Sequence, residues 1–352
     1  MADKAHILIA DISGFTDFNA TTEIDHAAHI IAELLEVMIE AEDTGFTLAE
    51  IEGDALLMYR KGDPLSRVEL VDQCRRIFAA FHRQLMVIER DTVCRCSACQ
   101  GSSALTLKFV AHYGFIKEIK VDRFTKATGT EMIVAHRLMK NDVDSHEYIL
   151  ITEACCEAMG EGDDAPGQVW LKASQAYPSV GAVPFRCAML SDFRATIPKP
   201  EPRPRFSVVK GDDNLEIGIH APVRDVYQTL INVDKRPDWL EGVDTIERDL
   251  TSERIGMQHN CIFHGFTLIN KSVFAEYDLQ HARYSEEVRV VELNVTLLAH
   301  YEMVADDEGG TRLLFNVNWL GATLPAEAKR GLLAGQAANF ELLKIACETN
   351  PA

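Results

Sequence analysis

Two aspartates stand beside apolar segments in the first sixty residues. Asp11 lies in HILIADISGFTDF and Asp54 in AEIEGDALLMYR, and each apolar segment has the pattern of a buried strand. A buried carboxylate costs free energy unless a cation pairs with it, and two adjacent carboxylates repel each other. Mg²⁺ and Mn²⁺ bind carboxylate oxygens together with substrate phosphates. The pair therefore predicts a divalent-metal site. The simpler alternative is that Asp11 caps a helix and Asp54 occupies a turn.

Three cysteines form a second cluster with C-x-C-x-x-C spacing: Cys94, Cys96 and Cys99 in VCRCSACQG. Thiolates this close together can surround one Zn²⁺, which prefers four sulfur or nitrogen ligands. The neighbouring sequence offers no clear fourth ligand, because Cys74 lies roughly 20 Å away along a helix that rises about 1.5 Å per residue. A ligand from another subunit or from the second half of the chain would complete the site. The alternatives are a redox-active thiol pair and loop cysteines without chemistry.

Composition limits the classes of function. The chain has 352 residues and a formal net charge of −19, which argues against nucleic acid and anionic membrane surfaces as partners. The start, MADKAHILIADIS, lacks the layout of a signal peptide, and no apolar run approaches the roughly 20 residues of a membrane span. Nine unevenly spaced cysteines do not form a secreted disulfide framework. We therefore expect a cytoplasmic protein with reduced thiols.

A proline-rich stretch divides the chain. Four of the twelve prolines fall within residues 191–211, which is typical of an extended linker. We predict a first domain over residues 1–190, a linker over 191–204 and a second domain over 205–352.

The first domain has a pattern of alternating strands and helices. We predict, in order, a strand over 5–11, a helix over 26–41, a hairpin with its tip at Gly53 and Asp54, a helix over 66–88, strands over 105–114 and 115–122, and a helix near 131–141. This β-α-β-β-α-β order indicates a ferredoxin-like antiparallel sheet with helices on one face. It would bring the end of the first strand, with Asp11, beside the hairpin tip at Asp54. The fold class is therefore α+β.

The first 190 or so residues resemble a class III nucleotidyl cyclase homology domain. The motifs are ADISGFT, GDA, the strand LKFVAHYG and the helix GTEMIVAHRL. The resemblance implies two metal ions, Mg²⁺ or Mn²⁺, held by Asp11, Asp54 and the carbonyl of Ile12. It further implies a homodimer with a shared site. The remaining positions it assigns are the triphosphate site at Ser13, Gly14, Phe15 and Thr16, the base-reading pair Glu50 and Lys126, and Arg137 as a phosphate ligand.

Three positions depart from the cyclase pattern. Ile133 stands where the family has an asparagine that binds the ribose, and Lys126 matches neither adenylyl nor guanylyl cyclases. Only Arg186 is cationic near the position of the late phosphate-binding lysine. In an active cyclase, a ribose-binding or phosphate-binding group of this kind stabilises the transition state by about 3–4 kcal/mol. We therefore expect a divergent bacterial domain that binds metal, and could bind a nucleotide, without cyclising it. The alternative is an active cyclase that makes a cyclic nucleotide from ATP or GTP.

The second domain has a strand over 214–223, a helix over 224–235, five further strands and a closing helix over 325–348. This order resembles the START-like or polyketide-cyclase-type (SRPBCC) superfamily, which implies a helix-grip fold and an apolar cavity between the sheet and the last helix. Period-2 alternation places Tyr301 on the same face of its strand as Val295, Leu297 and Ala299. In the next strand, Phe315 and Trp319 likewise share one face. The remaining candidates for the cavity are Trp239, as a lid, and Phe340.

The cavity residues have a plain alternative, which is that they simply fill the core. The polar candidates of this domain are His259, Cys261 and His264, although a lone strand histidine is more often structural. We expect the cavity to bind a hydrophobic small molecule or lipid in a sensor or signalling role. The superfamily includes hydrolysis, cyclisation and transport, so the fold does not specify a reaction.

Overall fold

The computed structural model describes residues 2–20, 24–160, 168–203, 211, 213–248, 254–320 and 324–349. The fold is a mixture of helices and two large sheets. Contacts divide the chain into two compact units. The first unit contains residues 1–89 and 100–201, and the second contains residues 202–352 together with the segment 90–99. None of the described helices is long and apolar enough to cross a membrane.

The sheet of the first unit is built around β1 (Asp3–Ser13), whose residues 5–10 are all buried. Its strand order is β2-β3-β1-β4-β6-β8-β7, with β5 paired to β4. β1 runs antiparallel to β3 and β4, and β6 is parallel to β4. The other strands are β2 (Thr47–Glu52), β3 (Ala55–Lys61), β4 (Thr106–Val121), β5 (Phe124–Thr128), β6 (Tyr148–Thr152), β7 (Leu171–Tyr177) and β8 (Gly181–Met189).

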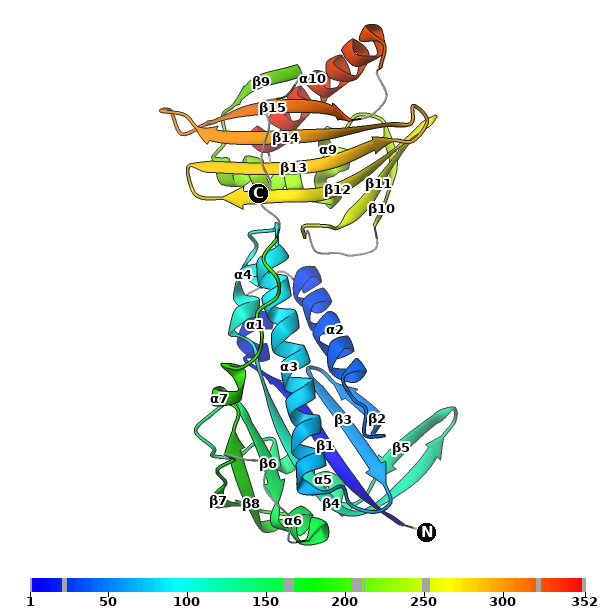
Figure 1. Ribbon diagram of the computed structural model, residues 1–352, viewed down its shortest axis with the longest axis vertical. Helices are drawn as coiled ribbons and strands as arrows, with labels where there is room; N and C mark the ends of the chain where they lie inside the picture. The colour runs from blue at the N-terminus through cyan, green and yellow to red at the C-terminus, as the bar shows by residue number, and fades with distance from the viewer. Residues whose placement is uncertain are drawn as a thin grey trace. The chain divides into compact units, whose positions relative to one another are not determined.

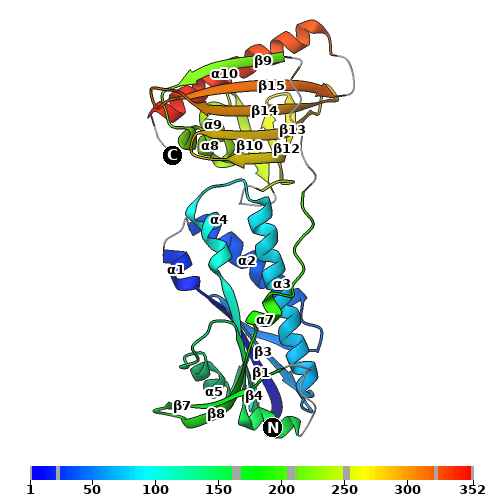
Figure 2. The same cartoon turned by 60° about the vertical axis from the view of Figure 1, so that its left-hand side comes forward.

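Helices cover both faces of this sheet (Figures 1 and 2). α5 (Thr130–Leu138) packs on the face that carries Ala5, Ile7 and Ile9, whereas α2 (Ile24–Glu40) and α3 (Arg67–Asp91) lie on the opposite face. The expectation that all helices share one face was therefore wrong. The remaining helical segments are α1 (Phe15–Ala20), α4 (Ser97–Gly101), η1 (Ser102–Ala104), α6 (Glu153–Met159) and α7 (Ser191–Arg194).

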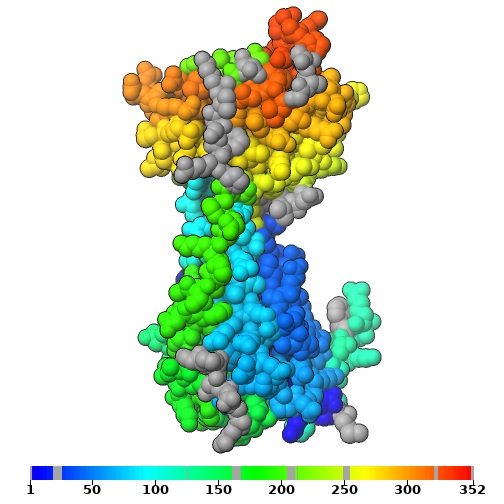
Figure 3. Space-filling view, viewed as in Figure 1, coloured from blue at the N-terminus to red at the C-terminus, as the bar shows by residue number. Residues whose placement is uncertain are grey.

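Two further segments differ from the predictions. Residues 105–114 and 115–122, which we predicted as two strands, form the single long strand β4, because Gly114 continues the pairing with β1 instead of turning. The start of the proline-rich stretch is not a free linker. It forms α7, and the ring of Phe193 packs against Phe78 and under Arg75 of α3. Figure 3 shows this segment, in green, alongside α3. Residues 204–210, which include the last residue of the predicted linker, lie outside the described residues.

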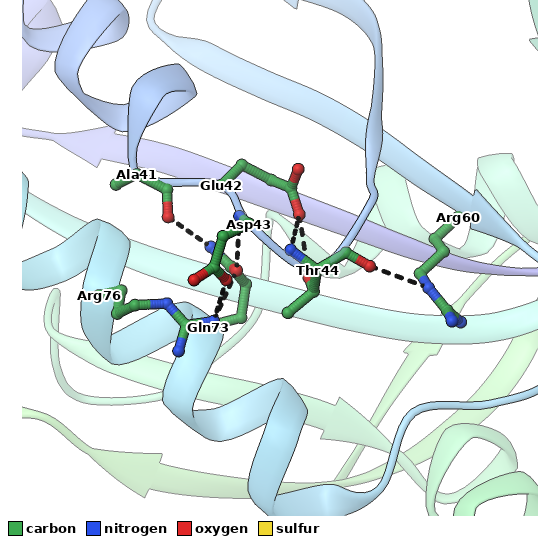
Figure 4. Close-up of polar contacts among 7 residues, drawn as sticks. All are labelled: Ala41, Glu42, Asp43, Thr44, Arg60, Gln73 and Arg76. Carbon is green, nitrogen blue, oxygen red and sulfur yellow. Dashed lines mark hydrogen bonds and ion pairs between the residues drawn. The ribbon is translucent and has the colours of Figure 1, made fainter.

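A buried glutamine fixes the turn that leads from α2 into β2 (Figure 4). The Gln73 side chain, fully buried on α3, accepts from the Asp43 amide (3.2 Å) and donates to the Ala41 carbonyl (3.0 Å). Arg60 donates to the Thr44 carbonyl at 3.0 Å. Because β2 and β3 form the hairpin that carries Asp54, this turn holds one side of the candidate site in place.

The second unit is an antiparallel sheet with one long helix. The strand order is β10-β11-β12-β13-β14-β15-β9, so the first strand of the unit closes beside the last. α10 packs against α8, α9 and β9. β10, in a region for which no strand was predicted, forms one edge. The elements are β9 (Asp213–Ile219), α8 (Val223–Ile231), η2 (Val233–Lys235), α9 (Arg236–Trp239), β10 (Val243–Arg248), β11 (Gln258–Phe263), β12 (Phe266–Tyr277), β13 (His281–Val290), β14 (Val295–Ala305), β15 (Thr311–Leu320) and α10 (Ala326–Thr349).

The segment 90–99 is hydrogen-bonded within the second unit. The Tyr227 hydroxyl donates to the Val93 carbonyl at 2.9 Å, and the Ile255 amide donates to the Asp91 carbonyl at 2.7 Å. Arg203 donates to the Asp91 carboxylate at 2.7 Å. Ten residues from the middle of the sequence therefore belong to the fold of the C-terminal half.

Candidate functional site

Asp11 and Asp54 lie on adjacent strand ends. Asp11 on β1 is paired in register with Ala55, the residue after Asp54, and the Ile12 amide donates to the Asp54 carbonyl at 3.3 Å. Gly53 adopts a positive φ of 65°, which lets the β2–β3 turn place Asp54 at this point. The two carboxylates are close enough that the charge of Asp11 helps to raise the pKa of Asp54. The predicted meeting of these residues is therefore seen in the structure.

Lys108 is the residue that the sequence argument missed. It lies on β4 directly opposite Asp11, with its Nζ 3.1 Å from Asp11 Oδ2. Burial raises the pKa of Asp11, and Lys108 opposes that rise. Burial, with the charge of Asp11, raises the pKa of Asp54 to about 6. The Lys108 ammonium thus supplies part of the positive charge that a metal would bring. When both carboxylates are ionised, Asp11, Asp54 and Lys108 together carry one net negative charge.

The segment predicted to receive phosphates follows directly. Gly14 has a φ of 88°, and the chain enters α1 at Phe15, with Phe18 donating to the Gly14 carbonyl at 3.0 Å. Gly14 and Thr16 are exposed, whereas the Ser13 hydroxyl is buried and has no hydrogen-bond partner in the described part of the chain. The segment offers exposed positions, Gly14 and Thr16, directly after the strand that carries Asp11.

The two residues predicted to read the base contact each other. Lys126 Nζ on β5 lies 3.2 Å from Glu50 Oε2 on β2. In this structure the pair is an exposed ion pair, which contributes little stability in water.

The remaining cyclase positions are not brought together. Ile133 and Arg137 lie on the exposed side of α5. Arg186 on β8 donates two hydrogen bonds to Glu153 of α6, at 3.0 and 3.1 Å. These bonds hold the pKa of Glu153 below its usual value. The cation expected near the phosphates is therefore already engaged in a bidentate ion pair.

The three cysteines of the second cluster lie together within the segment 90–99. Ligand atoms of Cys94, Cys96 and Cys99 lie within 4.8 Å of one another, and all three residues are buried. The Cys96 amide donates to Cys94 Sγ and the Cys99 amide to Cys96 Sγ, both at 3.4 Å. Hydrogen bonds from Cys94 and Cys96 lower the pKa of the Cys99 thiol. Three thiols at this spacing fit three of the four ligand positions that structural Zn²⁺ takes.

A pocket of about 100 Å³ lies in the second unit between the sheet and helices α9 and α10. Among the predicted cavity residues, Trp239, Tyr301, Phe315 and Trp319 line it. Phe340 does not; its ring packs edge-on behind Tyr301 and Phe315, at centroid distances of 6.3 and 5.2 Å. The Trp319 indole donates to Asp213 at 2.8 Å. The other lining residues are Arg236, Leu240, Leu268, Asn270, Glu286, Val288, Val290, Leu297, Ala299, Val317, Leu332, Leu333 and Gln336.

The polar groups of the second unit differ from those predicted. A buried ion pair, Arg236 with Glu286, lines the pocket, and the Tyr284 hydroxyl donates to Glu286 at 2.9 Å. His259 and Cys261 are buried but do not line the pocket, and His264 is exposed in the β11–β12 turn. Arg236 gave no signal because its charge lies in a polar stretch, where burial is not expected.

Comparisons with known proteins cover parts of the chain. A family model described as a protein of unknown function (DUF2652) matches residues 31–148. The uncharacterized protein Rv2561/Rv2562 of Mycobacterium tuberculosis is 34% identical over 131 residues, which is 37% of this chain and 61% of that protein. The chain thus spans about three fifths of the length of this relative.

Solved structures similar to the chain include nucleotidyl cyclases. The adenylyl cyclase CyaB from P. aeruginosa has a TM-score of 0.38 and 17% identity, and the match covers 54% of this chain and 95% of CyaB. The guanylyl cyclase Cya2 has a TM-score of 0.34 and 17% identity, with coverage of 53% and 94%. The hypothetical protein jhp0584 from Helicobacter pylori has a TM-score of 0.33 and 14% identity, with coverage of 38% and 84%.

Proposed function

We propose that this chain is a small-molecule-binding protein with a sensing role. Its first unit is a cyclase-type domain that binds a divalent cation, Mg²⁺ or Mn²⁺, without cyclising nucleotides, and its second unit takes an apolar ligand. The observation that carries the proposal for the first unit is the ion pair between Lys108 and Asp11, 3.1 Å apart. A two-metal reaction needs both carboxylates free for the cations, and here one of them is shared with a lysine.

The surrounding groups support the same conclusion. Transition-state charge in phosphoryl transfer is stabilised by positioned cations. Arg186 is instead bound to Glu153 through two hydrogen bonds, and Ile133 brings no hydrogen-bonding group. Asp11, Asp54 and the carbonyl of Ile12 would hold the cation, and Ser13 to Thr16 would receive the phosphates of a nucleotide. Bound nucleotide would then serve as a signal and not as a substrate.

For the second unit we propose a START-like helix-grip domain. The support is its antiparallel sheet of seven strands, in which β9 closes beside β15 and α10 packs over the sheet. The pocket lies between that sheet and the helix, where apolar side chains from alternate positions of β14 and β15 face it. Leu297, Ala299 and Tyr301 follow the period-2 pattern expected of one strand face.

An assay with nucleotides tests the first unit. Purified protein is incubated with ATP or GTP and Mn²⁺, with Asp11→Ala as the matched variant, and cyclic nucleotide and pyrophosphate are measured. We expect no turnover, together with Mn²⁺ binding that the variant loses. Cyclic nucleotide that disappears in Asp11→Ala would overturn the non-cyclising proposal.

The second candidate is an active cyclase, which the adjacency of Asp11 and Asp54 favours. Its site would be completed by a second copy of the chain, because sites of the cyclase family lie between two subunits and Arg137 is exposed on α5. Light scattering during size-exclusion chromatography distinguishes the cases: a shared catalytic site requires a dimer at micromolar concentration, and a strictly monomeric protein would contradict it.

We also propose that Cys94, Cys96 and Cys99 hold one structural Zn²⁺. The support is the distance of at most 4.8 Å among their sulfur atoms and the preference of structural zinc for thiolate ligands. Elemental analysis should give one zinc per chain, and Cys99→Ala should lose it. Cys156→Ala, at a buried cysteine of the first unit, is the control that should retain it. Zinc-free protein with full stability would contradict the proposal.

A further inference from the structure

Residues that line the pocket of the second unit carry buried donors for which the described part of the chain offers no acceptor. Among the described residues, the Nε of Arg236 and the Nε1 of Trp239 are both buried without a hydrogen-bond partner, and both residues line the pocket. The two residues are 4% and 2% exposed. Gln336 of α10, also in the lining, has an Nε2 without a partner among the same residues. A buried polar group without a partner costs about 1–3 kcal/mol, so each such group in a folded protein calls for an explanation.

The donors are arranged together. Arg236 and Trp239 are the first and last residues of α9, three positions apart, and the guanidinium lies 5.8 Å from the centre of the indole ring. Indole and guanidinium nitrogens can only donate. The other indole of the pocket, Trp319, is not equivalent, because its N–H is donated to Asp213.

The charge of the pocket is already balanced. Glu286 pairs with Arg236 and also accepts from the Tyr284 hydroxyl. An anionic ligand would therefore meet a neutral ion pair, and would add one uncompensated charge to a site lined mainly by apolar side chains. A water molecule suits the donors less well than a carbonyl, because water must also donate two hydrogen bonds of its own.

We propose that the pocket binds a small neutral molecule with one ring and a carbonyl oxygen, with that oxygen accepting from Trp239 and Arg236. This inference rests on the proposed small-molecule function of the second unit and specifies its ligand class. The volume of about 100 Å³ is smaller than the roughly 300–1,000 Å³ of sites for drug-sized ligands. A single ring fits the pocket better than a lipid chain does.

Two probes of the same shape test the proposal on the full-length protein. Acetophenone carries a carbonyl, whereas α-methylstyrene replaces its oxygen with a methylene group; benzoate adds a negative charge. Ligand-observed NMR titration gives the three dissociation constants. We expect acetophenone to bind at least about tenfold more tightly than α-methylstyrene, since even one hydrogen bond made to an otherwise unsatisfied donor is worth about this factor. Benzoate should bind less tightly than acetophenone.

Variants locate the effect. Trp239→Phe keeps the ring and removes the N–H, so it should reduce the preference for acetophenone severalfold and leave α-methylstyrene unchanged. If Trp239→Phe folds poorly, Gln336→Leu, which removes another donor from the half-buried face of α10, tests the same preference for acetophenone over α-methylstyrene. Trp170→Phe, in the first unit, is the control that should change neither affinity.

The outcomes separate the inference from the function on which it rests. Equal binding of acetophenone and α-methylstyrene would overturn the carbonyl proposal and leave the apolar-ligand function intact. Benzoate as the tightest binder would overturn the neutral class. Binding of neither neutral probe would overturn the proposed function of this pocket and the inference with it.

Discussion

At the scale of single residues, Lys108 decides how the acidic pair behaves. Its ammonium lies 3.1 Å from Asp11, so an incoming cation must displace it or share the carboxylate with it. Lys108→Met keeps the length of the side chain and removes its charge. We expect this substitution to tighten Mn²⁺ binding about tenfold, or by about 1.4 kcal/mol, in isothermal titration calorimetry.

The control for this substitution is Lys120→Met, an exposed lysine on the same strand. It changes the net charge of the protein equally and should leave the Mn²⁺ affinity almost unchanged. An unchanged affinity in Lys108→Met would mean that the lysine and the metal do not compete.

His259 predicts how the second unit responds to acid. Burial, together with the charges of Arg236 and Arg248, lowers the pKa of His259 to about 2, below the ordinary value near 6.5. The unfolded chain therefore binds a proton below pH 6.5 that the folded chain excludes. Stability is fully present above pH 6.5 and falls as the pH drops from there toward 2, by up to about 1.4 kcal/mol per pH unit for this one proton.

Urea unfolding at pH 7.5, 6 and 5 measures this dependence. In His259→Leu, the free energy of unfolding should fall less steeply between pH 6 and 5, by the contribution of one proton. The buried His6 and His82 of the first unit, whose pKa values burial also lowers to about 4, contribute their own shares in both proteins. His264→Leu, in the exposed turn of the same hairpin, should keep the full slope, and an equal slope in His259→Leu would refute the assignment.

At the scale of elements, the turn after α2 depends on one side chain. Gln73 satisfies the Asp43 amide and the Ala41 carbonyl. Gln73→Leu leaves both backbone groups without that partner, and we expect a loss of about 2–3 kcal/mol in the free energy of unfolding. Chemical denaturation measures it. Gln84→Leu on the same helix is the control, because Gln84 donates to a side chain, that of Glu33, instead of satisfying the backbone of a turn. This substitution should cost less than about 1 kcal/mol.

The elements up to about residue 140 and most of those in the second unit were predicted, whereas β6, α6, β7, β8 and β10 were not. Alternation and turn residues gave the hairpin tip at Gly53 and Asp54, because those signals are local. The joining of residues 105–122 into β4 depends on pairing with β1, which no local pattern encodes. The same holds for the site. Asp11 and Asp54 could be inferred from their motifs, whereas Lys108 reaches Asp11 only through the register of β1 and β4.

At the scale of the whole molecule, the second unit includes residues 90–99. A protease site inserted between Glu201 and Pro202 should therefore give two fragments that co-elute in size-exclusion chromatography. The first fragment would still contribute Val93 to the Tyr227 hydroxyl and Asp91 to the Ile255 amide. Asp91→Ala keeps the backbone carbonyl but removes the carboxylate that accepts from Arg203 at 2.7 Å, so it should weaken this association. Fragments of the unaltered sequence that separate without denaturant would contradict the expectation.

The same ten residues have a consequence for inheritance. The matched family region, residues 31–148, contains them, so a gene rearrangement that joined a different N-terminal domain at residue 201 would remove a part of the C-terminal fold. Neither half can be exchanged as an independent module without a compensating change in the other. Substitutions between Arg90 and Cys99 are consequently constrained twice, by the helices that flank them in the chain and by the C-terminal residues to which they bond.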